Sequence, residues 1–142
     1  MWEIAHRAGT TAMYFWANSY NYNQVYQYVH NNDNRTKDGS KTQMFRVGAY
    51  KSNQWGLYDT MGNLAELCRD VGGYGDLKDA PDAFTPKYDS TATKAMSRGY
   101  YWEAGPANER FKSSCRGLSP MSTAITAASG RNLGFRLFFV AP

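Results

Sequence analysis

Hydrophobic and polar positions along the 142-residue chain alternate in short runs, and the first run has the spacing of a helix. Between Trp2 and Ala8, the apolar residues Ile4, Ala5 and Ala8 fall on one helical face. Gly9 follows at a position where glycine commonly ends a helix, because it adopts left-handed backbone angles without strain. The pattern therefore predicts the end of an amphipathic helix over Trp2–Ala8.

Several later runs are short and extended in character, as expected of strands bounded by turn residues. Strands are predicted over Met44–Tyr50, Leu64–Arg69, Lys94–Trp102 and Phe111–Cys115. The final run, Leu133–Val140, is the most hydrophobic in the chain. Because a strand buried on both faces reads as a continuous apolar run, this segment is predicted to be the central strand.

Two segments have no regular period and are predicted to be loops. Asn18–Asn34 consists almost entirely of Asn, Tyr and Gln. It is either a binding loop, since Tyr and Asn are the residues that binding loops favour, or a surface loop whose tyrosines cover the core edge. Residues 71–90 are rich in Gly, Pro and acidic residues and are predicted to form a surface excursion.

Length and charge limit the classes of function. The chain length corresponds to one domain, residues 1–142. Lys and Arg are scattered and the net charge is only +4, so we expect no nucleic-acid surface. No apolar run approaches about 18 residues, so no membrane span is expected. The histidines, His6 and His30, are isolated from other metal-ligating side chains, and no nucleophile motif or phosphate loop is present.

The stretch Asn53–Asp70 carries the most suggestive chemistry. It combines the carboxylates of Asp59 and Glu66 with glycines that allow tight turns. Calcium takes six to eight oxygen ligands from carboxylates and backbone carbonyls, so this stretch could form a calcium loop. The alternative is a tight turn whose carboxylates pair with nearby arginines.

The two cysteines, Cys68 and Cys115, are too few for a disulfide scaffold. If they pair, closing the loop between them would stabilise the fold by about 4 kcal/mol. The alternative is two buried free thiols that act as small apolar side chains.

Four segments, in order along the chain, resemble motifs of the formylglycine-generating enzyme and sulfatase-modifying factor family. Trp2–Thr11 is similar to the family's W-E-Y-A-A-R-A-G, and Gly56–Glu66 resembles G-L-Y-D-x-x-G-N-x-x-E. Arg98-Gly99 followed by Trp102 resembles R-G-G-S-W, and Arg131–Arg136 resembles the closing N-x-G-F-R.

The resemblance implies an α+β fold: an irregular variant of the C-type lectin fold with short sheets, few helices and much loop. It also implies a structural calcium ion held by Asp59 and Glu66 together with the carbonyls of Gly62 and Leu64. Family members usually have about as much chain again before the first motif, so Trp2 and Ile4 are expected to lose part of their cover.

The enzymes of the family oxidise a substrate cysteine with a copper-binding cysteine pair that follows the R-G-G-S motif. Here that region, Tyr101–Lys112, contains no cysteine, and R-G-G-S is replaced by R-G-Y-Y. Because soft thiolates select Cu(I), we expect no copper and no catalysis of that kind.

The resemblance therefore favours a non-catalytic binding or structural module, with the variable proteins of diversity-generating retroelements as one possible subtype. We expect a protein or glycan ligand and association with another chain or a second copy, and a bacterial or phage surface as the location. The alternative is an enzyme completed by a missing N-terminal half or a partner chain. The expected binding surface is aromatic and comprises Tyr20, Tyr22, Tyr26, Tyr28, Tyr100, Tyr101 and Trp102.

Overall fold

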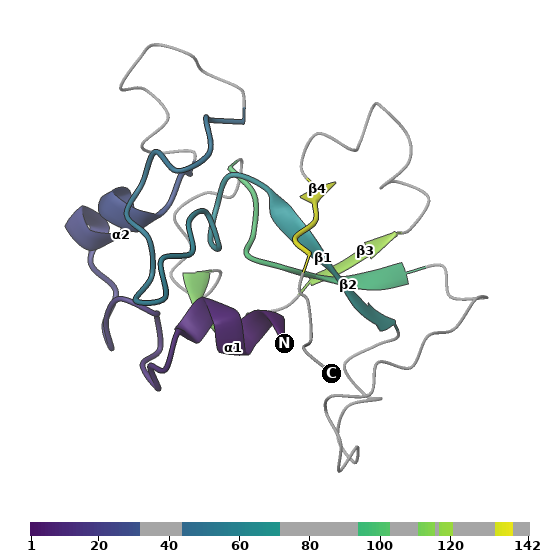
Figure 1. The fold of residues 1–142 in the computed structure, drawn as a ribbon, viewed down its shortest axis with the longest axis horizontal. Coiled ribbons are helices and arrows are strands. Elements are labelled where there is room, and N and C mark those ends of the chain that lie inside the picture. The colour runs from purple at the N-terminus through teal and green to yellow at the C-terminus, as the bar shows by residue number, and fades with distance from the viewer. Residues whose placement is uncertain (32–43, 72–93, 103–110, 116, 121–132, 138–142) are drawn as a thin grey trace.

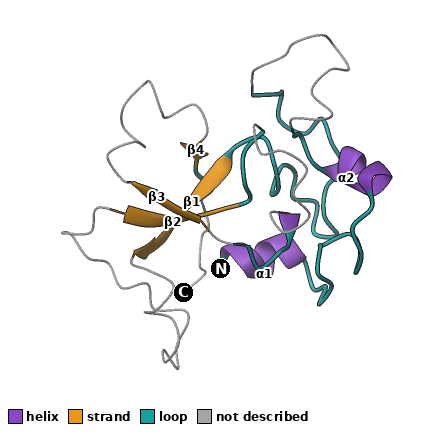
Figure 2. Ribbon diagram, turned by 180° about the vertical axis from the view of Figure 1, so that it is seen from behind, coloured by secondary structure: helices purple, strands orange, loops and turns teal. Residues whose placement is uncertain are grey.

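The structure is a computed structural model, and it describes residues 1–31, 44–71, 94–102, 111–115, 117–120 and 133–137. Helices α1 (Trp2–Arg7) and α2 (Tyr22–Tyr28), with their loops, lie to one side of a small sheet (Figure 1), and the reverse view shows the same separation (Figure 2). Helix α1 lies beside the sheet and α2 lies farther away. The fold is α+β with few helices and much loop, as predicted.

Helix α1 confirms the predicted helix, although its buried face differs. Ala8 ends the helix in the left-handed conformation, with φ 48°, and its N–H donates to the carbonyl of Ile4. Trp2, Ala5 and His6 are buried, whereas Ile4 is 47% exposed. Trp2 was predicted to be partly exposed, and this prediction is wrong. The same prediction for Ile4 agrees with its exposure.

Helix α2 lies within the segment predicted to be a loop, so that prediction is wrong for Tyr22–Tyr28. The side chain of Asn21 accepts a hydrogen bond from the N–H of Asn23 at 2.9 Å and so caps the helix. Val25 is fully buried and anchors the helix to the core. The sequence shows no apolar stripe that would reveal this helix, because Val25 is the one buried residue within it and the other positions are Tyr, Asn and Gln.

The sheet has the strand order β3-β2-β1-β4, made of β1 (Ala65–Val71), β2 (Lys94–Arg98), β3 (Gly117–Pro120) and β4 (Leu133–Gly134). β1 pairs antiparallel with β2 and parallel with β4. Glu66 lies opposite Arg98 in the β1–β2 ladder. Opposed residues share one face of a sheet, and both of these side chains contact α1.

Three strand predictions need correction. Residues 44–50 form no strand, because a turn at residues 47–48, with Gly48 at φ 71°, interrupts the extended run. Phe111–Cys115 is also a turn, and β3 begins only after it. Leu133–Val140 was predicted to be central, but β4 is a two-residue strand at the sheet edge, and residues 138–140 lie outside the described residues. Most of the predicted surface excursion, from residue 72 to 90, also lies outside them.

The core sits between α2 and the loops around it. Its buried members are Tyr14, Phe15, Val25, Val29, Met61 and Phe111. Gly62 has φ 78°, and a Cβ built there would lie 2.4 Å from the carbonyl oxygen of His30, so only glycine fits. The N–H of Gly62 donates to the carbonyl of Gly99 at 2.6 Å, and the N–H of Asn63 donates to that of His30 at 3.0 Å. These bonds join the helical side of the fold to the end of β2.

In the part of the chain that the structure describes, neither helix is long and apolar enough to cross a membrane.

Candidate functional site

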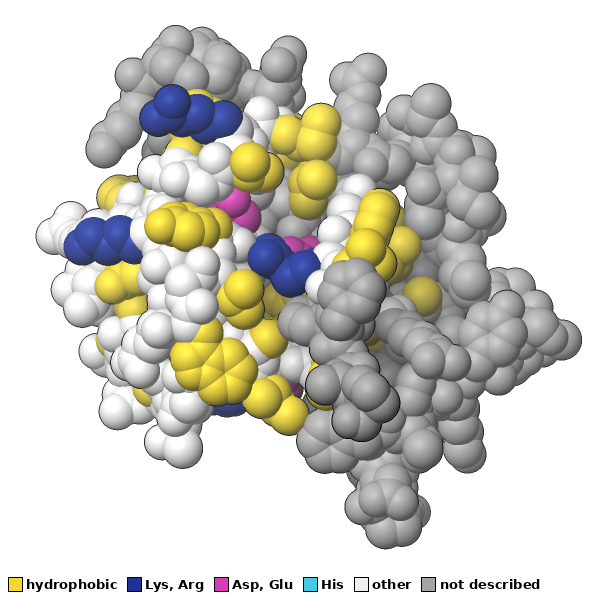
Figure 3. Space-filling view, viewed as in Figure 1, with side chains coloured by type: hydrophobic (Ala, Val, Ile, Leu, Met, Phe, Trp, Pro, Cys, Tyr) yellow, Lys and Arg dark blue, Asp and Glu magenta, His cyan; other side chains and the backbone are white. Residues whose placement is uncertain are grey.

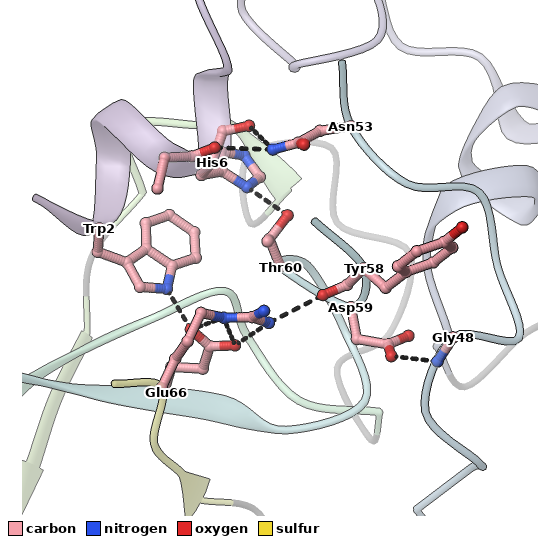
Figure 4. A network of polar contacts seen from close by, with 10 residues as sticks. Trp2, His6, Gly48, Asn53, Tyr58, Asp59, Thr60 and Glu66 are labelled. Atoms are coloured by element: carbon pink, nitrogen blue, oxygen red, sulfur yellow. Dashed lines mark hydrogen bonds and ion pairs between the residues drawn. The ribbon is translucent and has the colours of Figure 1, made fainter. Parts of the chain in front are cut away.

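Glu66 is the buried acceptor at the centre of a polar network between α1, β1 and the chain after β4 (Figure 4). Its side chain is 8% exposed. Trp2 Nε1 donates to Oε2 at 2.6 Å, while Arg136 donates through Nε at 3.1 and 3.2 Å and through Nη2 at 2.7 Å. Arg136 Nη2 also donates to the carbonyl of Tyr58 at 2.8 Å. The carboxylate is therefore fully paired, as a buried charge must be to be tolerated.

A second ion-pair group lies on the same face of the sheet. The Arg98 guanidinium pairs with Glu3 and lies over the Trp2 ring, 5.2 Å from its centroid. Arg7 donates to Glu3 at 2.9 Å. Burial alone would raise the pKa of Glu3, but the hydrogen bonds from Arg98 and Arg7 outweigh it and lower that pKa. This group fixes α1 on the sheet.

His6 is a packed histidine, as its isolation in the sequence indicated. Its ring stacks on Trp2 at 4.6 Å, and Nδ1 lies 2.9 Å from the hydroxyl of Thr60. Burial, followed by the charges of Arg98 and Arg7, lowers the pKa of His6 to about 3. The imidazole is therefore neutral near pH 7 and serves as part of the core.

Beside the Glu66 network lies a pocket of about 450 Å³, which we call the Asp59 pocket. It is formed by the turn at residues 47–48, the loop before β1 and residues 134–136. The face in Figure 3 has acidic and basic side chains close together near its centre, with hydrophobic side chains around them. The described lining residues are Val47, Gly48, Gly56, Leu57, Tyr58, Asp59, Asn63, Leu64, Glu66, Gly134, Phe135 and Arg136.

The structure brings together some of the predicted calcium ligands. Asp59, Leu64 and Glu66 line the Asp59 pocket, whereas Gly62 is not among its described lining residues. One oxygen of Asp59 accepts the N–H of Gly48 at 2.7 Å. In the described residues, no group of three or more His, Cys, Asp or Glu side chains is placed to hold a metal ion.

The arrangement of Glu66 decides how well calcium fits. Both of its oxygens already accept hydrogen bonds, and one of its partners is the positive guanidinium of Arg136, which repels a divalent cation. The residues as placed here do not fit an oxygen cage for calcium. Glu66 instead forms the carboxylate–arginine pair that was the alternative, and calcium binding stays a prediction.

The predicted aromatic surface divides into exposed and covered members. Tyr22 is 48% exposed and Tyr26 is 36% exposed, both on α2. Tyr20, Tyr28 and Tyr100 are half-buried and pack against the core. Tyr101 is also half-buried and stacks on Tyr100, at 6.4 Å between ring centroids.

Trp102 does not fit a place on this surface, because it is only 8% exposed. Its backbone N–H donates to the carbonyl of Asn63 at 3.0 Å, which holds the chain after β2 against the segment just before β1. The motif that suggested an exposed ring therefore contributes a core residue here.

Cys68 and Cys115 are free thiols in the structure, and both are half-buried. Cys68 lies in β1, as its alternating run indicated. The carbonyl of Cys115 accepts a hydrogen bond from Arg98 Nη1 at 2.8 Å. This places Cys115 beside the ion-pair group of α1.

Sequence reasoning did not identify the Asp59 pocket or the roles of Trp2 and Arg136 in the Glu66 network. The sequence did contain one signal for the Glu66 network. The alternative to a calcium loop was a tight turn whose carboxylates pair with nearby arginines. The distance of 70 positions between Glu66 and Arg136 concealed which arginine that would be.

The family model described as sulfatase-modifying factor enzyme 1-like domain matches residues 1–140, so the chain belongs to this family. The match spans nearly the whole chain and confirms the resemblance drawn from the four motifs.

Solved structures confirm the fold as the formylglycine-generating type of C-type lectin-like fold. Treponema denticola variable protein 1 is similar with a TM-score of 0.67 and 24% identity, over 94% of this chain and 43% of that chain. PvdO from Pseudomonas aeruginosa is similar with a TM-score of 0.63 and 21% identity, over 85% of this chain and 44% of that chain. The chain thus spans less than half the length of these two proteins. No curated protein matches it.

Proposed function

We propose that the chain is a non-catalytic module that binds a protein or glycan ligand through an aromatic surface on α2, which we call the α2 surface. It consists of Tyr22 and Tyr26, with the rings that support them. The observation that carries the proposal is a continuous series of ring contacts from these two exposed tyrosines into the core.

The contacts of the series make the α2 surface rigid. Tyr22 contacts Tyr26 at 6.2 Å and Tyr20 at 5.0 Å, measured between ring centroids. Tyr20 contacts the fully buried Tyr14 at 6.0 Å. A neighbouring ring, Trp16, stacks on Tyr14, which broadens the support.

Rigid tyrosines are well suited to recognition. Each presents a large amphipathic area and loses little side-chain entropy on binding, and aromatic residues dominate the energetics of many interfaces. The likeness to Treponema denticola variable protein 1 supports the scaffold of the proposal but not its ligand. The absence of cysteine from Tyr101–Lys112 supports a role without the family's copper chemistry.

A binding screen tests the proposal. The full chain is immobilised and exposed to a glycan array and to a displayed peptide library, and each ligand found is titrated against the parent chain and two variants. The double variant Tyr22→Ala/Tyr26→Ala should lose at least about tenfold in affinity, since one interface ring contributes about 1–2 kcal/mol. Trp55→Ala is the matched control, because Trp55 is also an exposed aromatic side chain, 57% exposed, and lies outside the α2 surface. Ligands that bind the double variant as well as the parent chain would overturn the proposal.

The alternative, an enzyme completed by another chain, predicts turnover. Incubation of the chain with Cu(I) and a cysteine-containing peptide should give no formylglycine, as measured by mass spectrometry. Formation of that product would reverse the assignment.

Association with another chain is part of the proposal, and α1 supplies the observation that favours it. Met1 is 54% exposed and Ile4 is 47% exposed, and residues three apart share a helical face. Exposed apolar side chains that adjoin on one face commonly mark an interface. Light scattering should give a mass above 16.0 kDa, and Ile4→Glu should lower it. A parent chain that is monomeric at high micromolar concentration would refute association with itself.

A further inference from the structure

The Asp59 pocket carries a charge that the Glu66 network does not balance. The lining residues that the structure describes include two carboxylates, Asp59 and Glu66, and one guanidinium, Arg136. Arg136 is committed to Glu66, so these two charges neutralise each other. Asp59 has no ion-pair partner among the described residues, and the hydrogen bond from Gly48 occupies only Oδ2. Among the described residues, the pocket therefore keeps one negative charge, and Oδ1 of Asp59 has no hydrogen-bond donor there.

Apolar side chains line the same pocket as this carboxylate. Val47 is 84% exposed, Tyr58 is 46% exposed and Phe135 is 76% exposed, and all three line the pocket. The pocket volume of about 450 Å³ falls in the range of small-ligand sites. Aromatic faces attract cations, and a long aliphatic stem packs well on apolar walls.

Asp59 is held in position before any ligand arrives. Its φ is 54°, a left-handed conformation that is uncommon outside glycine and that Asp tolerates better than most residues. The hydrogen bond from the N–H of Gly48 holds its carboxylate against the turn at residues 47–48 (Figure 4). Residues kept in such conformations are often found at binding sites, because the surrounding structure must maintain them.

We propose that the Asp59 pocket binds the basic side chain, lysine or arginine, of a peptide ligand. The ammonium or guanidinium group donates to Asp59 Oδ1, and its aliphatic stem lies between Tyr58 and Phe135. This is a second recognition site, since none of its described lining residues belongs to the α2 surface. Calcium would need several more oxygen ligands than Asp59 alone supplies, and Glu66 is already paired, so the organic cation fits better. Arg46 is exposed next to Val47 but does not line the pocket.

Titrations monitored by nuclear magnetic resonance test the proposal on the full ¹⁵N-labelled chain. The probes are Nα-acetyl-lysine amide and Nα-acetyl-arginine amide, with neutral Nα-acetyl-norleucine amide as the matched apolar control. The basic probes should shift the backbone amides of Gly48, Asp59 and Gly134, and the neutral probe should not.

Two variants locate the binding. Asp59→Asn keeps an acceptor for Gly48 and so preserves the turn, but it should weaken the basic probes about tenfold, because a charge-assisted hydrogen bond becomes a neutral one. Tyr58→Ala removes one wall and should also weaken them. Trp55→Ala, an exposed ring outside the pocket, should leave the affinity unchanged.

Several outcomes would overturn the proposal. These are equal shifts with the norleucine probe, full affinity in Asp59→Asn, no shift at high millimolar probe, and calcium moving these amides where the basic probes do not. None of these results bears on the α2 surface, which is tested with Tyr22 and Tyr26.

Discussion

Replacing Glu66 by glutamine tests the central claim about how this fold is held together. The substitution keeps the size of the side chain and removes its charge. Glutamine still offers one oxygen to Trp2 or Arg136, but its NH₂ group then faces a second donor. The network loses its charge-assisted bonds and gains a repulsive contact.

The expected loss of stability in Glu66→Gln follows from how deeply the Glu66–Arg136 pair is buried. Removing one partner of a buried ion pair typically costs about 3–5 kcal/mol, and exposed pairs contribute about 0–1 kcal/mol. Glu66 is 8% exposed while Arg136 is 26% exposed, so solvent screens the arginine in part. We therefore expect Glu66→Gln to lower the free energy of unfolding by about 2–3 kcal/mol.

Glu3→Gln is the matched control, because Glu3 also pairs with two arginines but is 27% exposed. Glu3→Gln should lower the free energy of unfolding by about 1 kcal/mol. Urea denaturation followed by fluorescence measures both variants. Adding Arg136→Gln to Glu66→Gln should cost little more, because the pair is already broken. A loss below about 0.5 kcal/mol for Glu66→Gln would show that the network does not stabilise the fold.

Three further predictions concern stability. Burial lowers the pKa of His6 from 6.5 to about 3. Below pH 6.5 the unfolded chain therefore binds a proton that the folded chain does not bind. The free energy of unfolding should fall as the pH drops from 6.5 toward 3. His6→Gln should flatten that dependence in urea melts at several pH values, and parallel curves would contradict the burial. Gly62→Ala should lower the free energy of unfolding by more than about 2 kcal/mol, because the added Cβ meets His30. The control Gly9→Ala, also at positive φ but in open space, should lower it by about 1 kcal/mol. Thermal denaturation measures both, and similar losses would show that the structure relaxes around the new Cβ at Gly62. Melting temperatures in chelator and in millimolar calcium test the calcium prediction: the Arg136–Glu66 pair predicts that they coincide, and a calcium-dependent rise would instead confirm the calcium site.

Sequence reasoning identified the elements whose signal is local. Helix α1 was predicted from its spacing and its terminal glycine, and β1 and the start of β2 were predicted from alternation. The four motifs identified the family, and one of them, G-L-Y-D-x-x-G-N-x-x-E, fixes backbone features such as the left-handed Asp59 and Gly62.

The predictions that were wrong depended on tertiary context. The hydrophobic run from Leu133 suggested a central strand, but its register with β1 is only two residues long and Phe135 points to solvent. Helix α2 was missed because its stability comes from the Asn21 cap and the packing of Val25 rather than from an apolar stripe. The Asp59 pocket needs three segments from distant parts of the chain, and composition cannot show that they meet.

The parallel β1–β4 pairing has a consequence for the order in which the chain folds. β1 and β2 are close in sequence, whereas Ala65 and Leu133 are far apart, so the chain must close a longer loop to form the second ladder. A two-residue ladder gains little in return, so β4 should dock late and exchange its amide protons earliest among the strands. Because Phe135 and Arg136 follow β4 directly, brief release of this strand would remove two lining residues of the Asp59 pocket and leave the α2 surface intact. The α2 surface would then persist through fluctuations that transiently remove the Asp59 pocket.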